Sequence, residues 1–227
     1  MSQLAFRHAG LLNYAQAWSW QRSLREQRQS DKLPDLLLHL EHPPTFTLGR
    51  SSRPEHLKHD ATTLGGLGFD LHEVERGGSV TYHGPGQLVG YPIMDLRPRG
   101  RDVHRFIRQL EEAMIGALGD FGLEGHTREG WTGVWVNGDR KIASIGIHVR
   151  HWITMHGFAL NVLTDLSHFS FINPCGLDSG VMTSMAEQLG NEPDMDEVST
   201  HVSQQFAAVF DCQLTALELG PAFSTGT

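Results

Sequence analysis

An Asn-Gly dipeptide at residues 137–138 lies between two apolar runs and constrains the fold more than any other feature of the chain. Both residues readily adopt positive φ, so this dipeptide is the strongest short signal for a two-residue hairpin turn. The runs Gly133–Val136 and Lys141–Val149 are therefore predicted to be antiparallel neighbours in a sheet.

The remaining periodicity predicts three helices and five further strands. The helix at 103–121 has the clearest apolar stripe, with Asp102 as its N-cap and Gly122 after its end. Strands and helices do not alternate strictly, which favours an α+β fold (mixed α/β, a largely antiparallel sheet with flanking helices). No repeat or linker divides the chain, so we expect one catalytic domain over 1–227. The other predicted helices are 14–29 and 197–210, and the other strands are 35–40, 71–75, 87–96, 153–162 and 213–217.

Charge and composition exclude several classes of protein. The chain has 227 residues with 18 Lys and Arg against 26 Asp and Glu, giving a net charge of −8 that argues against non-specific nucleic-acid binding. Residues 151–227 contain nine acids and no Lys or Arg, which no feature of the sequence explains. We find no membrane span and no signal peptide at the N-terminus. Two cysteines cannot form a disulfide framework, so we expect a cytoplasmic protein.

The densest unusual segment runs from Arg76 to Gln87, with the sequence RGGSVTYHGPGQ. Its four glycines permit positive φ and let a ligand approach the backbone closely. The spacing matches neither a P-loop nor a dinucleotide-binding fingerprint. A tight structural turn is the simpler explanation, but Arg, Tyr and His beside permissive backbone also suit a substrate-binding segment.

Lys141 is one of three lysines in a chain with 15 arginines, and it lies among small and apolar residues. Alternation along a strand would place it on one face with Ala143 and Ile145. Burial on that face would depress its pKa and suit it to proton transfer or to pairing with a thiolate. The alternative is a surface lysine beside a hairpin turn.

Cys175 is bracketed by Pro174 and Gly176, which predicts a fixed turn with an exposed thiol. Cys212 lies beside a predicted strand and fits an inert buried cysteine. A nucleophilic cysteine needs a cationic or basic neighbour, for which Lys141 or a histidine is a candidate.

The chain has 14 histidines, several in close pairs, but neither zinc-finger spacing nor an HExxH motif occurs. We therefore expect no bound metal. His83 and His156 stand apart from the other histidines, because each adjoins a glycine within a motif-like segment.

Six segments occur in one order along the chain: RGGSVTYHGPGQLVGYPI, GVWV, RKIASIGIHV, TMHGFALNV, FINPCGL and MTSM. Together they resemble the lipoyl(octanoyl) transferases over roughly 36–189. The resemblance implies a fold similar to the catalytic domain of biotin and lipoate protein ligases. It also implies transfer of an octanoyl group from octanoyl-acyl carrier protein to a lysine of lipoyl domains, without a cofactor. The implied acceptors are the lipoyl domains of 2-oxoacid dehydrogenase complexes and the glycine cleavage H protein.

The resemblance also assigns residues. Cys175 matches the cysteine that carries the acyl thioester, and Lys141 matches the lysine that lowers its pKa. Ser144 departs from the alanine expected in many relatives, which adds a hydroxyl without changing the chemistry. Val80, Ile142 and Phe158 are candidates to line an apolar tunnel for the acyl chain. The implied substrate-binding residues are Arg76, Gly77, Gly78, Ser79, Val80, Thr81, Tyr82, His83, Ser144, Ile145, Gly146, Gly157, Phe158 and Ala159.

Two alternatives remain beside this hypothesis. An ATP-dependent lipoate or biotin ligase would share the fold but would need an adenylating site and no acyl-cysteine. A non-catalytic scaffold would bind acyl carriers or lipoylated domains. A basic stretch is either a solvated surface or a docking patch at the mouth of the site for an acidic partner. Its residues are Arg97, Arg99, Arg101, Arg105 and Arg108, with Arg140 and Arg150 beside Lys141.

Overall fold

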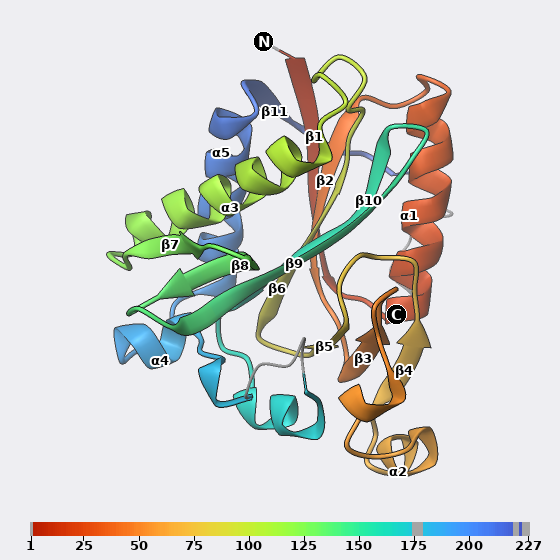
Figure 1. Cartoon of the computed structure of the whole chain (residues 1–227). Helices are drawn as coiled ribbons and strands as arrows, with labels where there is room; N and C mark the ends of the chain where they lie inside the picture. The colour runs from red at the N-terminus through yellow and green to blue at the C-terminus, as the bar shows by residue number, and fades with distance from the viewer. Residues whose placement is uncertain (1, 174–178, 220–222, 224–227) are drawn as a thin grey trace.

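The computed structural model describes residues 2–173, 179–219 and 223 (Figure 1). Cys175, the expected nucleophile, lies outside the described residues. An eight-stranded sheet forms the centre, in the order β11-β1-β2-β6-β10-β9-β8-β7. Its strands are β1 (Ser2–Leu11), β2 (Asp35–Glu41), β6 (Gln87–Ile93), β7 (Gly125–Arg128), β8 (Trp131–Val136), β9 (Arg140–Arg150), β10 (Ile153–Asn161) and β11 (Cys212–Ala216).

Most neighbours in this sheet are antiparallel, and only β1 pairs in parallel, with β2 and β11. The predicted α+β class with a largely antiparallel sheet is therefore confirmed. The predicted hairpin is also present, since Val136 pairs with Arg140. Asn137 and Gly138 in its turn both have positive φ, 46° and 82°.

Three long helices cover the sheet. The helices α3 (Val103–Asp120) and α5 (Met195–Val209) pack together on one face, and α1 (Tyr14–Gln29) covers the other (Figure 1). Asp102 caps α3 as predicted, because its carboxylate accepts from the Arg105 amide at 2.9 Å. All three helices were predicted, since each has a long apolar stripe to bury.

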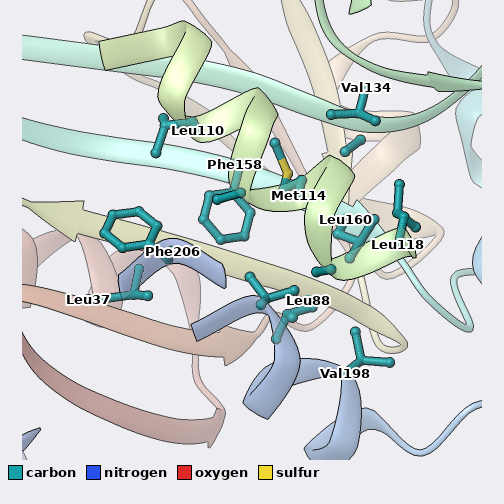
Figure 2. Packing of buried hydrophobic residues seen from close by; sticks show 14 of the residues in the cluster. Leu37, Leu88, Leu110, Met114, Leu118, Val134, Phe158, Leu160, Val198 and Phe206 are labelled. Carbon is teal, nitrogen blue, oxygen red and sulfur yellow. The ribbon is translucent and has the colours of Figure 1, made fainter. Parts of the chain in front are cut away.

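The core between the large sheet and helices α3 and α5 is tightly packed. Figure 2 shows Phe158 of β10 lying between Leu110 and Met114 of α3 and Phe206 of α5. Gly90 of β6 makes room for this ring, because a Cβ there would lie 2.1 Å from the Phe158 ring. Phe158 is 3% exposed.

A second sheet of three strands, β4 (Asp70–Glu73), β3 (Thr45–Leu48) and β5 (Val80–His83), lies to one side of the first (Figure 1). It has its own apolar cluster, which includes Phe46, Tyr82 and Phe169. The sequence did not predict β1, β3, β5 or β7. Short helical segments complete the described chain: α2 (Ala61–Gly66), α4 (Met185–Leu189), and the 3-10 helices η1 (Pro54–His56), η2 (Leu166–Phe171) and η4 (Ser179–Val181).

In the described part of the chain, no helix has the length and apolar character needed to cross a membrane.

Candidate active site

A cavity of about 590 Å³ lies where the large sheet meets the glycine-rich segment. Its walls come from the ends of several elements: the segment before β5, strands β6, β8, β9 and β10, and the first turn of α3. The size suits a small-molecule site, for which 300–1,000 Å³ is typical. Its lining residues include Arg76–Thr81, His83, Lys141, Ser144–Ile147, His156–Ala159, Val103, Ile107 and Trp131.

Fourteen of the residues that the sequence assigned to the site line this cavity. They are Arg76, Gly77, Gly78, Ser79, Val80, Thr81, His83, Lys141, Ser144, Ile145, Gly146, Gly157, Phe158 and Ala159. Two other residues that were expected at the site, Tyr82 and Ile142, do not line the cavity. The Tyr82 side chain packs in the core of the small sheet, where its hydroxyl is hydrogen-bonded to His168 Nδ1 at 2.7 Å. Ile142 is fully buried in the main core.

The glycine-rich segment is held against β9 by its backbone. The Gly77 amide donates to the Ile147 carbonyl at 2.9 Å, and Gly78 has φ 84°, a conformation that favours glycine. Arg76 is 7% exposed, and its guanidinium donates to the Thr47 carbonyl at 2.7 Å and to the Thr47 hydroxyl at 2.8 Å. The segment is therefore a rigid wall fixed from both sides.

The edge of β9 contributes backbone polar groups to the cavity. The Ile147 carbonyl points away from β10, toward Gly77. Alternation along an antiparallel strand gives Ile145 the same orientation, so its N–H and C=O also point away from β10. Gly146 lies tightly against the glycine-rich segment, because a Cβ there would lie 2.9 Å from the Gly77 carbonyl.

Lys141 lines the cavity and is partly buried. Its ammonium is 5.5 Å from the centroid of the Trp135 ring, within the range of a cation–π contact. The expectation that it shares a face with Ala143 by strict alternation is wrong. The pairing of β8 with β9 shifts between Val134 and Trp135, and Ile142 and Ala143 both pack into the same core cluster. A bulge of this kind redirects the side chains before it.

The chain on both sides of residues 174–178 is anchored beside this cavity. Before residue 174, the Asn173 amide donates to the His56 carbonyl at 2.9 Å, and the His56 ring is hydrogen-bonded to the Ser79 hydroxyl. After residue 178, the Thr183 amide donates to the Lys141 carbonyl at 2.9 Å. The described flanks of Cys175 are therefore tied to two parts of the cavity wall.

A chain of buried hydrogen bonds runs behind the wall, and sequence reasoning did not find it. His83 Nδ1 is 2.8 Å from Gln87 Oε1, and Gln87 Nε2 donates to Asn161 Oδ1 at 2.9 Å. Asn161 Nδ2 in turn donates to the Thr183 carbonyl at 2.9 Å. The chain thus connects the histidine of the glycine-rich segment to the residue that holds Lys141. The sequence signal for this chain was the amide side chains of Gln87 and Asn161, each in an otherwise apolar strand.

Tyrosines and histidines form the polar wall near α1. His42 Nδ1 lies 2.7 Å from the Leu12 carbonyl and must donate to it, so its Nε2 accepts from the Tyr91 hydroxyl at 2.7 Å. Burial lowers the pKa of His42 to about 4 and that of His83 well below its usual range. Tyr14 stacks between His72 and His83. His42 and His83 are therefore neutral at pH 7 and act as hydrogen-bonding groups.

His156 has the most unusual backbone in the cavity wall. It lies within β10 yet has φ 58°, and its amide donates to Gln21 Oε1 at 2.8 Å. Its side chain is 2% exposed, with Nε2 3.6 Å from Glu75. Trp18 also donates to the Glu75 carboxylate, and these contacts lower the pKa of Glu75 to about 2. Such local strain in a cavity wall is typical of functional sites.

Within the described ranges, no group of three or more His, Cys, Asp or Glu side chains has the geometry to hold a metal ion. The basic stretch also lies apart from the cavity lining. Arg99 and Arg105 line a separate, shallower hollow, and Arg97 pairs with Asp95 at 2.7 Å. Arg140 binds Glu187 at 3.0 Å.

Comparison with known sequences decides the family. The sequence model of the lipoyl protein ligase A/B catalytic domain matches residues 13–207. The octanoyltransferase of Solibacter usitatus is 48% identical over 214 residues, which is 94% of this chain and 96% of that protein. The chain belongs to the octanoyltransferase family. Another octanoyltransferase, from Gloeobacter violaceus, is 46% identical over 220 residues and 96% of both chains. The resemblance seen in the sequence motifs is thereby confirmed.

Solved structures support the fold expected for an octanoyltransferase. Ta0514 of T. acidophilum, a putative lipoate protein ligase solved with bound lipoic acid, superposes with a TM-score of 0.76 at 16% identity. That match covers 98% of this chain and 91% of the ligase. The biotin protein ligase of Aquifex aeolicus matches less closely, with a TM-score of 0.52 at 11% identity, covering 93% and 70% of the two chains. At these identities the likeness shows the fold alone.

Proposed function

We propose that this protein transfers an octanoyl group from octanoyl-acyl carrier protein to a lysine of lipoyl domains, through a thioester on Cys175. The proposed acceptors are those of 2-oxoacid dehydrogenase complexes and the glycine cleavage H protein, in the cytoplasm, with 1–227 as one catalytic domain. One observation carries the proposal: Lys141 lies in the wall of the cavity, and its carbonyl anchors Thr183, which follows the Cys175 segment.

In the first step, the Cys175 thiolate attacks the carbonyl carbon of the octanoyl thioester. A bond forms between the Cys175 sulfur and the acyl carbon as the bond from that carbon to the carrier sulfur breaks, and the carrier thiolate leaves and takes up the proton of the Lys141 ammonium, which becomes a neutral amine. The Lys141 ammonium favours the thiolate form of Cys175 by its charge. The amide of Ile145, pointing out from β9, is in place to donate to the tetrahedral oxyanion.

In the second step, the ε-amine of the acceptor lysine attacks the acyl-cysteine. The new C–N bond gives an amide, and the Cys175 thiolate leaves as the nitrogen loses its proton. Neutral Lys141 can accept this proton. Because the donor is already a thioester, the two steps are balanced without ATP or another cofactor.

The apolar part of the cavity suits the acyl chain. Val103 and Ile107 of α3, Ile145 of β9 and Phe158 of β10 form a lobe on the α3 side of the sheet. A cavity of about 150 Å³ holds a six-carbon ring, so the nine heavy atoms of an octanoyl group need about 225 Å³. The cavity of about 590 Å³ thus leaves room for part of the donor beside the acyl chain.

Intact mass spectrometry after mixing with octanoyl-acyl carrier protein tests the proposal directly. Wild-type protein and Cys212→Ser should each gain one octanoyl mass, while Cys175→Ser should gain none. Cys212 is a suitable control because it is 4% exposed and lies in β11. Acylation that survives in Cys175→Ser would contradict the assigned nucleophile.

Two further assays separate the alternatives. An ATP-dependent ligase would transfer nothing without nucleotide, whereas we expect full transfer. A scaffold would show no loss of lipoylation in Lys141→Ala, whereas we expect a loss of about 10²–10⁴-fold in rate. Circular dichroism of Lys141→Ala confirms that the variant is folded.

A further inference from the structure

A cluster of basic side chains lies beside the glycine-rich segment, next to the part of β9 that follows Ile147. Arg50 Nη2 is 3.4 Å from His148 Nδ1. The Arg50 amide donates to the Arg76 carbonyl at 3.0 Å, and His148 directly follows Ile147, whose carbonyl accepts from Gly77. Neither side chain lines the cavity, but both adjoin residues that do. The pair therefore lies at the rim of the cavity.

Three more arginines extend this cluster across α1 and the end of β9. Arg25 is 8% exposed, its Nε has no hydrogen-bond partner, and its Nη1 donates to the Met155 sulfur at 3.1 Å. Arg150 lies close enough to lower the pKa of Arg25, and Arg22 stacks over Trp18 at 4.3 Å. A buried guanidinium nitrogen without a partner normally costs stability, unless a ligand satisfies it.

Carboxylates of the described chain make no close ion pair with the arginines of this cluster. Arg22, Arg25, Arg50 and Arg150 form no ion pair with a carboxylate within the ranges that the structure describes. Glu26 of α1 and Glu75 lie near Arg25 and offset part of its charge, but Glu75 is also engaged by Trp18 and His156. A local excess of positive charge in a protein of net charge −8 is a strong indication of an anion-binding surface.

The distance from Lys141 to this basic cluster limits which anion can bind there. Lys141 and Ile147 lie six residues apart on β9, which corresponds to about 20 Å for an extended strand. This inference rests on the proposed function, in which the donor is an acyl thioester on a phosphopantetheine arm. Thirteen bonds separate the sulfur of that arm from its phosphorus, or about 16 Å at the extension of a polypeptide. The arm covers most of this distance, and the long side chains of Lys141 and Arg50 can span the remainder, so the phosphate can reach Arg50 when the thioester is near Lys141.

We propose that Arg50 and His148 bind the phosphate of the phosphopantetheine thioester donor, with Arg25 and Arg150 adding positive charge around it. The geometry of the pair suits this role. A guanidinium can only donate, so Nδ1 of His148 accepts from Arg50 and its proton is on Nε2. The pair thus presents imidazole Nε2–H and the remaining guanidinium N–H groups, which are good phosphate ligands.

The test compares two small donors, octanoyl-phosphopantetheine and octanoyl-pantetheine, which differ only by the phosphate. Wild-type protein should have at least a 10-fold higher kcat/KM for the phosphorylated donor, mainly through KM. Arg50→Gln should remove this preference and leave the value for octanoyl-pantetheine unchanged. Arg53→Gln is the matched control on the same loop, since Arg53 is 72% exposed and 3.8 Å from Glu55. It should keep the preference.

Phosphopantetheine without an acyl group provides a readout that does not need turnover. It should inhibit the wild-type protein better than pantetheine does, and this difference should shrink as salt rises. Equal kcat/KM for the two donors in the wild-type protein would overturn the phosphate site but leave the transferase function intact. No transfer from either donor, nor from octanoyl-acyl carrier protein, would instead contradict the proposed function. Arg50→Gln could instead lower kcat/KM only for octanoyl-acyl carrier protein. The cluster would then contact the surface of the carrier protein and not the phosphate, which would overturn the proposal.

Discussion

The amide of Gly77 donates to the carbonyl of Ile147, and this hydrogen bond joins the glycine-rich segment to the edge of β9. The two residues lie 70 positions apart, between the two sheets of the molecule. Through this contact the segment closes one side of the cavity, which Ile145 also lines. The close fit of the two backbones depends on the absence of a side chain at Gly146.

Gly146→Ala should therefore impair octanoyl transfer without unfolding the protein. A Cβ at this position would lie 2.9 Å from the Gly77 carbonyl and 3.2 Å from Arg76 Cδ, so the wall must move outward. We expect kcat/KM to fall at least 10-fold, because a small displacement of a positioned group has large effects on rate. Steady-state kinetics with octanoyl-acyl carrier protein measures this.

Gly119→Ala is the matched control for that substitution. Gly119 lies within α3, and a Cβ there would meet nothing within 4 Å. Alanine should stabilise the helix by about 0.5–1 kcal/mol and leave kcat/KM unchanged. Equal activity losses in both variants would show that the tight packing at Gly146 has no role in the reaction.

Asn161→Leu should weaken both stability and activity, because it breaks the hydrogen-bond chain behind the cavity wall. Gln87 and the Thr183 carbonyl would each lose a buried partner. Leaving such groups unsatisfied costs about 1–3 kcal/mol each. Urea denaturation measures the stability, and kcat under conditions where the variant is fully folded measures the effect on Lys141. A wild-type kcat in the folded variant would limit the chain to a structural role.

Phe158→Leu should change the acyl-length preference, because this ring belongs both to the core and to the cavity wall (Figure 2). Removing part of the ring enlarges the apolar lobe, so decanoyl transfer should rise relative to octanoyl transfer. Phe206→Leu is the control, since Phe206 lies in the same core cluster but does not line the cavity. Both variants should lose about 1–3 kcal/mol of stability. A shift in preference in both variants would mean that general loosening of the core sets the chain length.

The large elements of this fold were predictable because their periodicity is long. The helix α1 begins and ends at the predicted residues, Tyr14 and Gln29, and the hairpin at Asn137 was signalled by its own turn residues. The strand β3 is only four residues long and β1 is half-buried on both faces, so neither carries a clear alternation. Their places in the sheets are fixed by tertiary contacts instead.

The candidate site was likewise predictable from the sequence only in part. Residues that must contact a ligand through the backbone are concentrated in two short motifs, and these motifs pointed to most of the cavity lining. The partners in contacts between distant segments were not predictable from the sequence, even where an amide within an apolar strand marked one of them. Gln87 and Asn161 are 74 positions apart, and Arg50 meets His148 across 98 positions. The basic stretch at 97–108 was the more visible cluster in the sequence, yet its arginines largely pair with nearby carboxylates.

Acid should destabilise the protein well before its carboxylates titrate, because His42 is buried as a neutral ring. Its pKa is about 4 in the folded chain and about 6.5 when unfolded, so the unfolded state binds more protons between these values. The free energy of unfolding is therefore highest above pH 6.5 and falls as the pH drops toward 4, by up to about 1.4 kcal/mol per pH unit from this group. Urea denaturation at several pH values between 4 and 7.5 measures the slope. His42→Gln should reduce it by about one proton, whereas the exposed His104→Gln should leave it unchanged. An unchanged slope in His42→Gln would assign the acid sensitivity to the other buried histidines, His39, His83 and His156.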